Sequence, residues 1–266
     1  MGGAGDCPQR GGDPAVGARR GRQRIRVSLA TLVQSLADNK QLLGLRYAEW
    51  CTAAPTLEAD IAGAAMGLDD LGHSRVLHGS LRELGEADAE RDPTSPEHYL
   101  NVAYLDQPWS NWNQFVAANA VLDTAFTLMI EALANGKVEV LRSRLRKMLQ
   151  EEHYHYLHGR SWLRQGGGNP EVGRAFEEAV EWFGPEGGEV DQFHKAGQLT
   201  AGVADLRSSL GERVAIAAPP VPADWARWDP RRRRTRPGGI DARTFEMLRG
   251  LEEKRYMPAG GERKDS

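Results

Sequence analysis

Two short stretches, Asp70-Leu71-Gly72-His73 and Glu152-His153-Tyr154-His155, are the most informative part of this 266-residue chain. In both, a carboxylate precedes an imidazole by three residues, within a segment whose apolar residues recur at helical spacing. Residues i and i+3 share one face of an α-helix, so each pair directs an oxygen and a nitrogen toward the same point. Two such helices, joined by carboxylates from two others, form the dinuclear metal sites of helical bundles.

The apolar periodicity around these pairs predicts a helical domain. Ser28 can cap the first helix, Pro55 separates it from the second, and Asn135-Gly136 can end the third. No alternating apolar segment demands a sheet. The expected fold is therefore an all-α, ferritin-like four-helix bundle with extra C-terminal helices. The expected bundle helices are 28–53, 56–84, 111–133 and 138–164, with a crossover at 85–109 and further helices at 170–183, 189–211 and 241–254.

These segments divide the chain into one domain and two flanking parts. Residues 1–27 are rich in Gly and Arg and poor in apolar side chains, which predicts a disordered tail. The bundle is expected over 28–211, followed by a C-terminal arm with a short helix over 212–266. Within this arm, residues 216–239 are rich in Pro and Arg, which predicts a solvated loop or an arm that faces a partner.

Composition excludes several classes of function. The net charge of −3 gives no attraction to nucleic acid or to an anionic membrane. The two cysteines cannot build a disulfide framework, which predicts a cytoplasmic protein. We expect no membrane-spanning helix, since a spanning helix needs about twenty consecutive apolar residues, and we expect no secretion signal before the domain.

The chemistry of the two pairs favours a metal. Hard carboxylate oxygens and imidazole nitrogens, without a nearby thiolate, suit two iron ions, or manganese, better than structural zinc. One such pair is usually a solvated polar pair, but two copies in apolar helices favour a site over a solvated surface. Asp70, His73, Glu152 and His155 are therefore metal candidates, and His158 is either a neighbour of the site or a surface residue.

The other two helices must supply further carboxylates. Asp123 lies on an apolar helical stripe, where an ionised carboxylate is costly unless a metal, a proton or a partner neutralises it. Glu131, eight residues later on nearly the same face, is its competitor, and we prefer Asp123. On the first helix the choices are Glu49 and Asp38. Glu49 is included as a metal candidate, although it could equally hydrogen-bond a neighbouring helix.

Several motifs resemble those of a known family. The chain is similar to phenylacetic acid catabolic proteins, which are ferritin-like subunits of the multicomponent phenylacetyl-CoA epoxidase. The resemblance spans about residues 29–255 and is strongest to the structural partner subunit of that assembly. The motifs that carry it are Tyr47-Ala-Glu-Trp-Cys51, Ala54-Pro-Thr-Leu-Glu58, Gly67-Leu-Asp-Asp-Leu-Gly-His-Ser-Arg75 and Asp106-Gln-Pro108.

The resemblance implies two alternative functions, each in a homo- or hetero-oligomer. In the first, the chain is a di-iron monooxygenase subunit that epoxidises the ring of a CoA thioester, with electrons from a reductase. In the second, it is a metal-free scaffold that docks a catalytic ferritin-like homologue. Lys40 bears on this choice, because ungapped counting back from Ala54-Pro55 places it where the catalytic subunit has a helix-one glutamate. An ammonium there could neutralise neighbouring acids without metal.

Overall fold

The computed structural model describes residues 1–2, 28–85, 95–165, 168–216 and 225–255. Within these ranges the regular structure is helical, and the only strand-like feature is an isolated antiparallel bridge between Asp229 and Arg234. The all-α, ferritin-like bundle expected from the sequence is confirmed. The tail expected over 1–27 lies, apart from its first two residues, outside the described residues.

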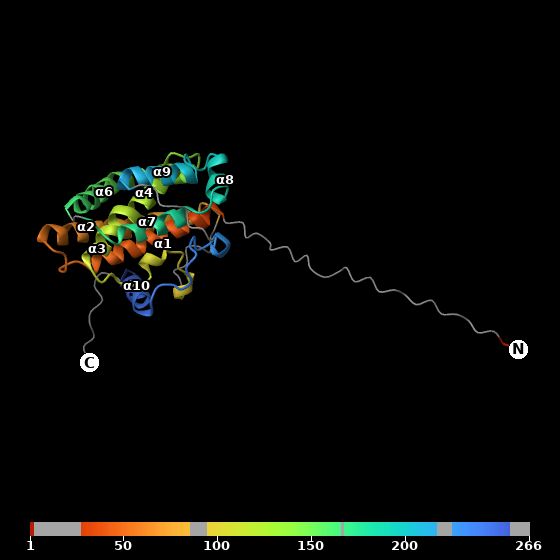
Figure 1. Ribbon diagram of the computed structural model, residues 1–266, viewed down its shortest axis with the longest axis horizontal. Helices are drawn as coiled ribbons and strands as arrows, with labels where there is room; N and C mark the ends of the chain where they lie inside the picture. The colour runs from red at the N-terminus through yellow and green to blue at the C-terminus, as the bar shows by residue number, and fades with distance from the viewer. Residues whose placement is uncertain (3–27, 86–94, 166–167, 217–224, 256–266) are drawn as a thin grey trace.

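Four long helical segments run along the long axis of the molecule and form the bundle (Figure 1). Ser28 caps the first helix as expected, since its hydroxyl accepts a hydrogen bond from the Thr31 amide at 3.1 Å. The third segment is continuous but contains a π-helical turn. In chain order the segments are α1 (Leu29–Ala48), α2 (Leu57–Leu81), the run α3 (Trp112–Ala117), η4 (Ala118–Asp123) and α4 (Thr124–Ala134), and α6 (Met148–Gln165).

Two expected helices are each divided in the structure. The segment 138–164 forms α5 (Glu139–Leu145) and α6, and the segment 189–211 forms α8 (Glu189–Lys195) and α9 (Val203–Val214). The second break follows from Gly197, whose φ of 74° is unfavourable for other residues and whose carbonyl accepts from the Lys137 amide. The remaining helices are α7 (Val172–Phe183) and α10 (Ala242–Arg255), with short 3₁₀ turns at Pro96–His98, Ala103–Leu105 and Trp225–Arg227.

Helices α1 and α2 approach each other closely at a pair of glycines. A Cβ added to Gly44 would lie 2.8 Å from the carbonyl oxygen of Gly67, and one added to Gly67 would lie 3.0 Å from that of Gly44. Any larger side chain would force the helices apart. This contact brings the backbone of α1 close to the turn of α2 that carries Asp70.

Polar residues of α1 attach the crossover segment to the bundle. Asp38 accepts a hydrogen bond from the Leu100 amide at 2.9 Å, and Asn39 accepts one from the Val102 amide at the same distance. Asp38, Asn39 and the following Lys40 have no exposed surface. The crossover therefore covers the side of α1 that carries Asp38 and Asn39.

The third segment bears on the expectation that the chain has no membrane-spanning helix. Residues Trp112–Ala134 form a helix long and apolar enough to cross a membrane, by length and composition alone, with a mean hydropathy of 1.5. Within the structure, however, 94% of the most apolar 18-residue stretch of this helix is buried. The π-turn lies inside this segment. Its apolar character is therefore that of a core helix, which the other helices surround.

The C-terminal arm is not the solvated loop expected from its arginines. Arg233 is buried, and its guanidinium donates hydrogen bonds to the carbonyl oxygens of Trp182 and Phe183 at 2.6 and 2.8 Å. Arg234 is also buried and pairs with Asp106 at 2.9 Å. Because these guanidiniums satisfy the end of α7 and the crossover, the described part of the arm is packed against the bundle.

Candidate functional site: a lysine-centred carboxylate and histidine cluster

Lys40 lies at the centre of a buried cluster of acids. Its ammonium Nζ is 2.9 Å from Asp70 Oδ1 and 2.5 Å from Glu152 Oε1, and it also donates to Asp123 Oδ1. The ammonium and all three carboxylates have at most 1% exposed side-chain surface. One residue from each of the four bundle segments therefore contributes to this contact.

Two histidines complete the cluster. His73 Nδ1 lies 2.9 Å from Glu152 Oε1, and His155 Nδ1 lies 3.0 Å from Asp123 Oδ2. The rings are 6.2 Å apart, and both side chains are almost fully buried. Each imidazole thus pairs with a carboxylate from a different segment.

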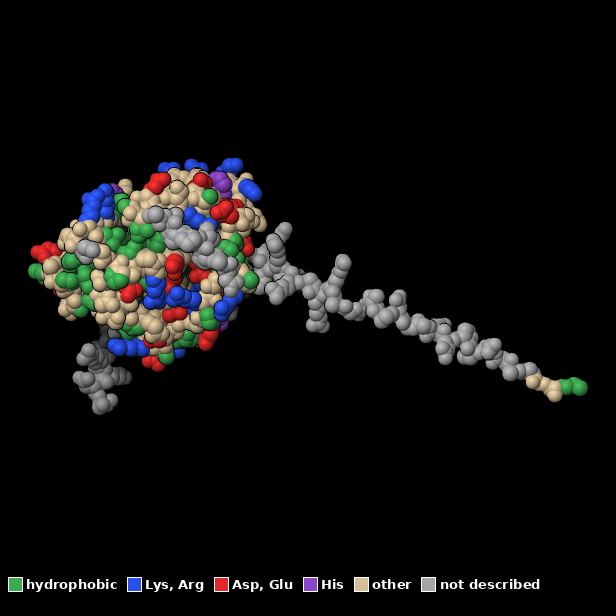
Figure 2. All heavy atoms as spheres, viewed as in Figure 1, with side chains coloured by type: hydrophobic (Ala, Val, Ile, Leu, Met, Phe, Trp, Pro, Cys, Tyr) green, Lys and Arg blue, Asp and Glu red, His purple; other side chains and the backbone are tan. Residues whose placement is uncertain are grey.

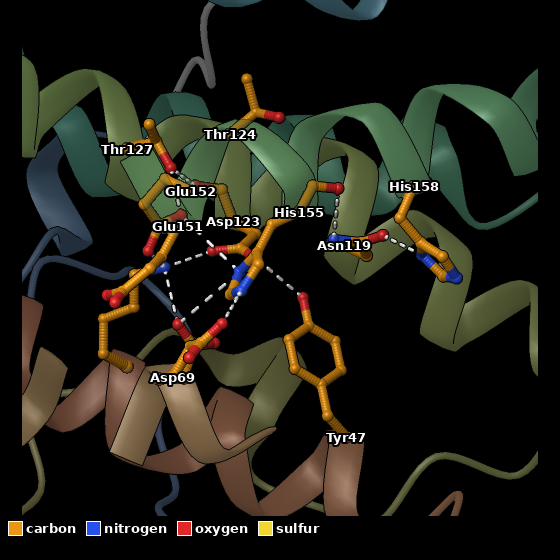
Figure 3. A network of polar contacts seen from close by, with 12 residues as sticks. Tyr47, Asp69, Asn119, Asp123, Thr124, Thr127, Glu151, Glu152, His155 and His158 are labelled. Carbon is orange, nitrogen blue, oxygen red and sulfur yellow. Dashed lines mark hydrogen bonds and ion pairs between the residues drawn. The ribbon is translucent and has the colours of Figure 1, made fainter. Parts of the chain in front are cut away.

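A shell of polar groups orients the cluster (Figure 3). The Tyr47 hydroxyl donates to Asp123 Oδ2 at 3.1 Å, and the Thr127 hydroxyl donates to Glu152 Oε2 at 2.6 Å. Toward solvent, Glu151 Oε2 lies 2.8 Å from His73 Nε2, and Asp69 Oδ2 lies 3.5 Å from His155 Nε2. Both outer nitrogens of the imidazoles therefore face acids at the surface of the bundle.

The π-turn positions the part of the cluster that comes from the third segment. Asp123 ends this turn, and Asn119, one turn earlier, donates to the carbonyl oxygen of His155 at 3.1 Å. Gly159 of α6 permits the contact, because an added Cβ would lie 2.8 Å from Ala120 Cα. π-turns interrupt helices at functional sites more often than elsewhere. Here the turn brings two polar side chains to the same side of the segment.

The electrostatics of the cluster favour charged lysine and histidines. Burial alone would lower the pKa of Lys40, but Asp123, Asp70 and Glu152 together raise it well above its usual value. Burial also opposes the charging of both imidazoles. Hydrogen bonds to Asp70 and Glu152 nevertheless raise the pKa of His73 to about 10, and Glu152 and Asp123 raise the pKa of His155 well above 6.5.

The pKa values of two of the acids are shifted in opposite directions by this environment. Burial would raise the pKa of Glu152, but Lys40 and His155 hold it well below its usual value. Burial raises the pKa of Asp70 despite the neighbouring Lys40. With the three carboxylates ionised, the ammonium and the two imidazolium rings supply the three positive charges that balance them. The cluster can therefore be electrically neutral without any further ion.

The structure brings together five of the six residues that the sequence indicates as metal candidates. Asp70, His73, Asp123, Glu152 and His155 all belong to the cluster. Ligand atoms of four of them, His73 being the exception, lie within 4.8 Å of one another.

Glu49 lies elsewhere, because its carboxylate pairs with Arg46 Nη1 at 2.9 Å beside the C-terminal end of α1. The two competing acids also have partners outside the cluster. Glu131 pairs with Arg213 at 2.7 Å, and Asp38 holds the crossover. His158 is a neighbour of the site, since its Nδ1 lies 2.8 Å from Asn119 Oδ1.

Sequence reasoning missed four residues that contact the cluster: Tyr47, Asp69, Thr127 and Glu151. Spacing could have identified two of them. Tyr47 follows Lys40 by seven residues and Thr127 follows Asp123 by four, so each lies on the same helical face as a member of the cluster. The two acids adjoin cluster residues in the sequence, and only the packing of α2 beside α6 shows that they reach the imidazoles.

Comparison with known proteins gives the family. Residues 17–207 match the family described as phenylacetic acid catabolic protein. The chain belongs to this family. A curated relative, the C subunit of 1,2-phenylacetyl-CoA epoxidase from Escherichia coli (strain K12), is 30% identical over 149 residues. That match covers 54% of this chain and 60% of the relative, so it spans less than two thirds of the relative's length.

The family and its ferritin-like fold make a metal the first group to test against these residues. Two observations favour one: the donor atoms lie close together, and Asp70 Oδ2 is buried without a hydrogen-bond partner among the described residues. A third observation opposes it. Lys40 Nζ contacts three of the carboxylates that would have to hold a cation, and its raised pKa keeps it positive. The acids and histidines alone fit a metal, but the complete set with Lys40 does not.

Proposed function

We propose that this chain is a metal-free structural subunit of an epoxidase assembly related to 1,2-phenylacetyl-CoA epoxidase, acting in phenylacetate catabolism in the cytoplasm. In this role it docks and stabilises a homologous, catalytic ferritin-like subunit. The observation that carries the proposal is the position of the Lys40 ammonium, which contacts one carboxylate from each of the other three bundle segments. The similarity to one subunit of the Escherichia coli epoxidase supports it.

The physical argument is that positively charged side chains replace the charge of a metal ion. Buried carboxylates must be neutralised, and a metal ion is one way to do so. Lys40, His73 and His155 provide the same positive charge through side chains that the chain itself carries. The fold thereby keeps the packing of a metal-binding bundle while the cluster contributes to stability and not to oxygen chemistry.

The second candidate is a di-iron monooxygenase subunit, with manganese as an alternative metal, a reductase as electron donor and a CoA thioester as substrate. It is favoured by the proximity of the ligand atoms of Asp70, Asp123, Glu152 and His155. It requires Lys40 to leave the cluster or to lose its proton. The three carboxylate contacts of its ammonium oppose the first, and its raised pKa opposes the second.

Metal analysis separates the two candidates. Iron and manganese are quantified in the purified wild type, in Lys40→Glu and in Lys40→Ala, after loading with each metal and removal of excess. The proposal expects less than about 0.1 ion per wild-type chain and a clear gain in Lys40→Glu, which restores a carboxylate at helix one. Adding Glu152→Ala to Lys40→Glu should abolish the gain. About two ions in the wild type, lost in Glu152→Ala and His155→Ala, would establish the metal candidate instead.

Docking is tested by co-expression with a ferritin-like homologue encoded nearby. The proposal expects a stable heteromer in which metal and oxygen consumption belong to the homologue. It expects both to persist when Glu152→Ala is placed in this chain alone. A heteromer that loses its metal with that variant contradicts the structural role.

A further inference from the structure

A cavity of about 290 Å³ lies between α6 and the last turn of α9, with Ala120 of the π-turn as part of its lining. None of its lining residues belongs to the lysine-centred cluster. In Figure 1 both helices lie along the upper edge of the bundle, and Figure 2 shows Lys and Arg side chains gathered at the end of that edge where α6 lies. Ligand cavities are about 300–1,000 Å³, so this one suits a small molecule.

Three arginines line the cavity. Arg160 and Arg164 belong to α6, and Arg213 belongs to the last turn of α9 on the opposite wall. Arg160 and Arg164 are four residues apart, so they share one face of their helix. Like charges at this spacing destabilise a helix, and the third arginine adds to the repulsion. A bound anion would remove this cost.

The two arginines of α6 have no acidic partner. Arg213 is neutralised by Glu131, since the two side chains pair at 2.7 Å. The guanidinium of Arg160 instead lies over the Tyr156 ring, 5.9 Å from its centroid. Among the residues that the structure describes, neither Arg160 nor Arg164 forms an ion pair. Two positive charges therefore line the cavity without a counter-ion from the described part of the chain.

The end of α9 does not supply the missing negative charge. Glu212 is the one acid in the lining, and its Oε1 lies 3.4 Å from the Ser208 hydroxyl. The carbonyl oxygen of Gly211 accepts a hydrogen bond from the Ile216 amide at 3.1 Å. Because this carbonyl already has a donor, it competes less for the guanidiniums across the cavity.

The rest of the lining is apolar. Leu163 lies between the two arginines in the sequence of α6 and packs against the hydrophobic core. The other apolar residues of the lining are Ala120, Val214 and Ala215. An apolar body placed against these side chains is removed from water, which favours binding. The cavity therefore combines the two features that an amphipathic anion requires.

We propose that this cavity binds a small phosphate monoester. Its phosphate pairs with Arg160 and Arg164, and its apolar body lies against Leu163 and Ala120. Guanidiniums bind phosphate oxygens in a planar, bidentate fork, and a phosphate monoester carries about 1.5–2 negative charges near pH 7, which matches two guanidiniums better than one carboxylate does. The site goes beyond the proposed structural role and does not depend on whether the cluster holds a metal.

Isothermal titration calorimetry of the purified full chain with phenyl phosphate, at pH 7.5 and low salt, provides the test. We expect one site per chain with a dissociation constant below about 1 mM. Inorganic phosphate should bind at least about tenfold more weakly, because it has no apolar body. Benzoate, which has the ring and a single charge, should also bind at least about tenfold more weakly.

Substitutions at the cavity test each part of the site. Arg160→Gln and Arg164→Gln should each weaken phenyl phosphate binding by about tenfold, because one charge-assisted contact is lost. Arg142→Gln on α5 is the matched control, since Arg142 is 43% exposed and pairs with Glu139 instead. It should leave binding unchanged. Circular dichroism and the unfolding midpoint report whether each variant remains folded.

Two more variants separate specific binding from general attraction of anions. Glu212→Gln should strengthen binding by about threefold, because it removes the one negative charge of the lining. Leu163→Ala should weaken phenyl phosphate by about fivefold and leave inorganic phosphate unchanged, because it shortens only the apolar wall.

The proposal is overturned by a wild-type chain that gives no binding heat with phenyl phosphate up to about 5 mM. It is equally overturned if inorganic phosphate or benzoate binds as tightly, or if Arg142→Gln weakens binding as much as Arg160→Gln does. None of these results bears on the structural role of the chain. Conversely, a wild-type chain that binds phenyl phosphate as expected and also holds two irons would refute the proposed function and not this inference.

Discussion

Replacing Lys40 by methionine tests how the buried acids are neutralised. Methionine retains most of the length of the lysine stem and removes its charge, so three buried carboxylates lose their shared partner. Breaking a buried ion pair by removing one member costs about 3–5 kcal/mol, because the remaining charge is left uncompensated in a medium of low polarity. That is a large part of the roughly 5–15 kcal/mol by which a domain is stable.

The assay is urea unfolding followed by circular dichroism at pH 7 in buffer with a chelator. With a denaturant slope of about 2 kcal/mol per molar, the midpoint of Lys40→Met should fall by about 1.5–2.5 M. The matched control is Lys147→Met. Lys147 pairs with Glu151 at 3.5 Å while 84% exposed, and its loss should change the unfolding free energy by less than about 0.5 kcal/mol.

The pH dependence gives a second readout of the same substitution. Lys40 holds the pKa of Glu152 low, so in the wild type this carboxylate contributes stability above about pH 4.5 that is lost as the pH falls further. Without the ammonium, Glu152 should take up a proton more readily, and the deficit of Lys40→Met should shrink between pH 7 and pH 5. A variant as stable as the wild type in the chelator, at every pH, would refute the reasoning.

Three other predictions concern the surroundings of the cluster. Burial and the charge of His155 lower the pKa of His158 to about 4. The neutral His158 side chain should therefore contribute up to about 3 kcal/mol to the free energy of unfolding above about pH 6.5, and this contribution should be lost on acidification toward pH 4. His158→Gln should flatten that part of the stability profile measured by thermal unfolding. Gly44→Ala should destabilise the protein by about 1–3 kcal/mol, because its Cβ would meet the carbonyl oxygen of Gly67. Gly72→Ala, where the added Cβ meets no atom, should stabilise the protein by about 0.5–1 kcal/mol. Equal effects of the two substitutions would contradict the close contact of α1 and α2. Arg233→Ala should cost about 2–4 kcal/mol, since two buried carbonyls of α7 lose their donor, and unchanged urea unfolding would show that the arm is not held as described.

The arrangement of the arm shows where charge patterns mislead. Four consecutive arginines outside a helix usually indicate a solvated loop, and local sequence contains nothing that distinguishes Arg231, which is exposed, from Arg233, which is buried. The difference arises because α7 ends with unsatisfied carbonyls beside the arm. Burial of an arginine depends on such distant acceptors, so it follows from the packing and not from the run itself.

The helical periodicity and the two carboxylate–histidine pairs were sufficient to predict the bundle and five members of its polar cluster. Apolar spacing, caps and the i, i+3 rule act over one or two turns, so they can be read directly from neighbouring residues. The motifs were also sufficient to indicate the family, which the comparisons confirmed. The π-turn, the division of the fourth helix and the exclusion of Glu49 could not be obtained in this way.

Tertiary structure alone decided which charges meet. The sequence showed that Lys40 stood where a carboxylate was expected, but not that its ammonium reaches Asp70, Asp123 and Glu152 at once, across separations of 30, 83 and 112 residues. Electrostatic interactions between such residues depend on distance and burial in space, neither of which a linear pattern specifies. The carboxylates and histidines of the cluster were therefore evident from the chain, whereas the lysine that contacts three of these carboxylates was located only when four helices were packed together.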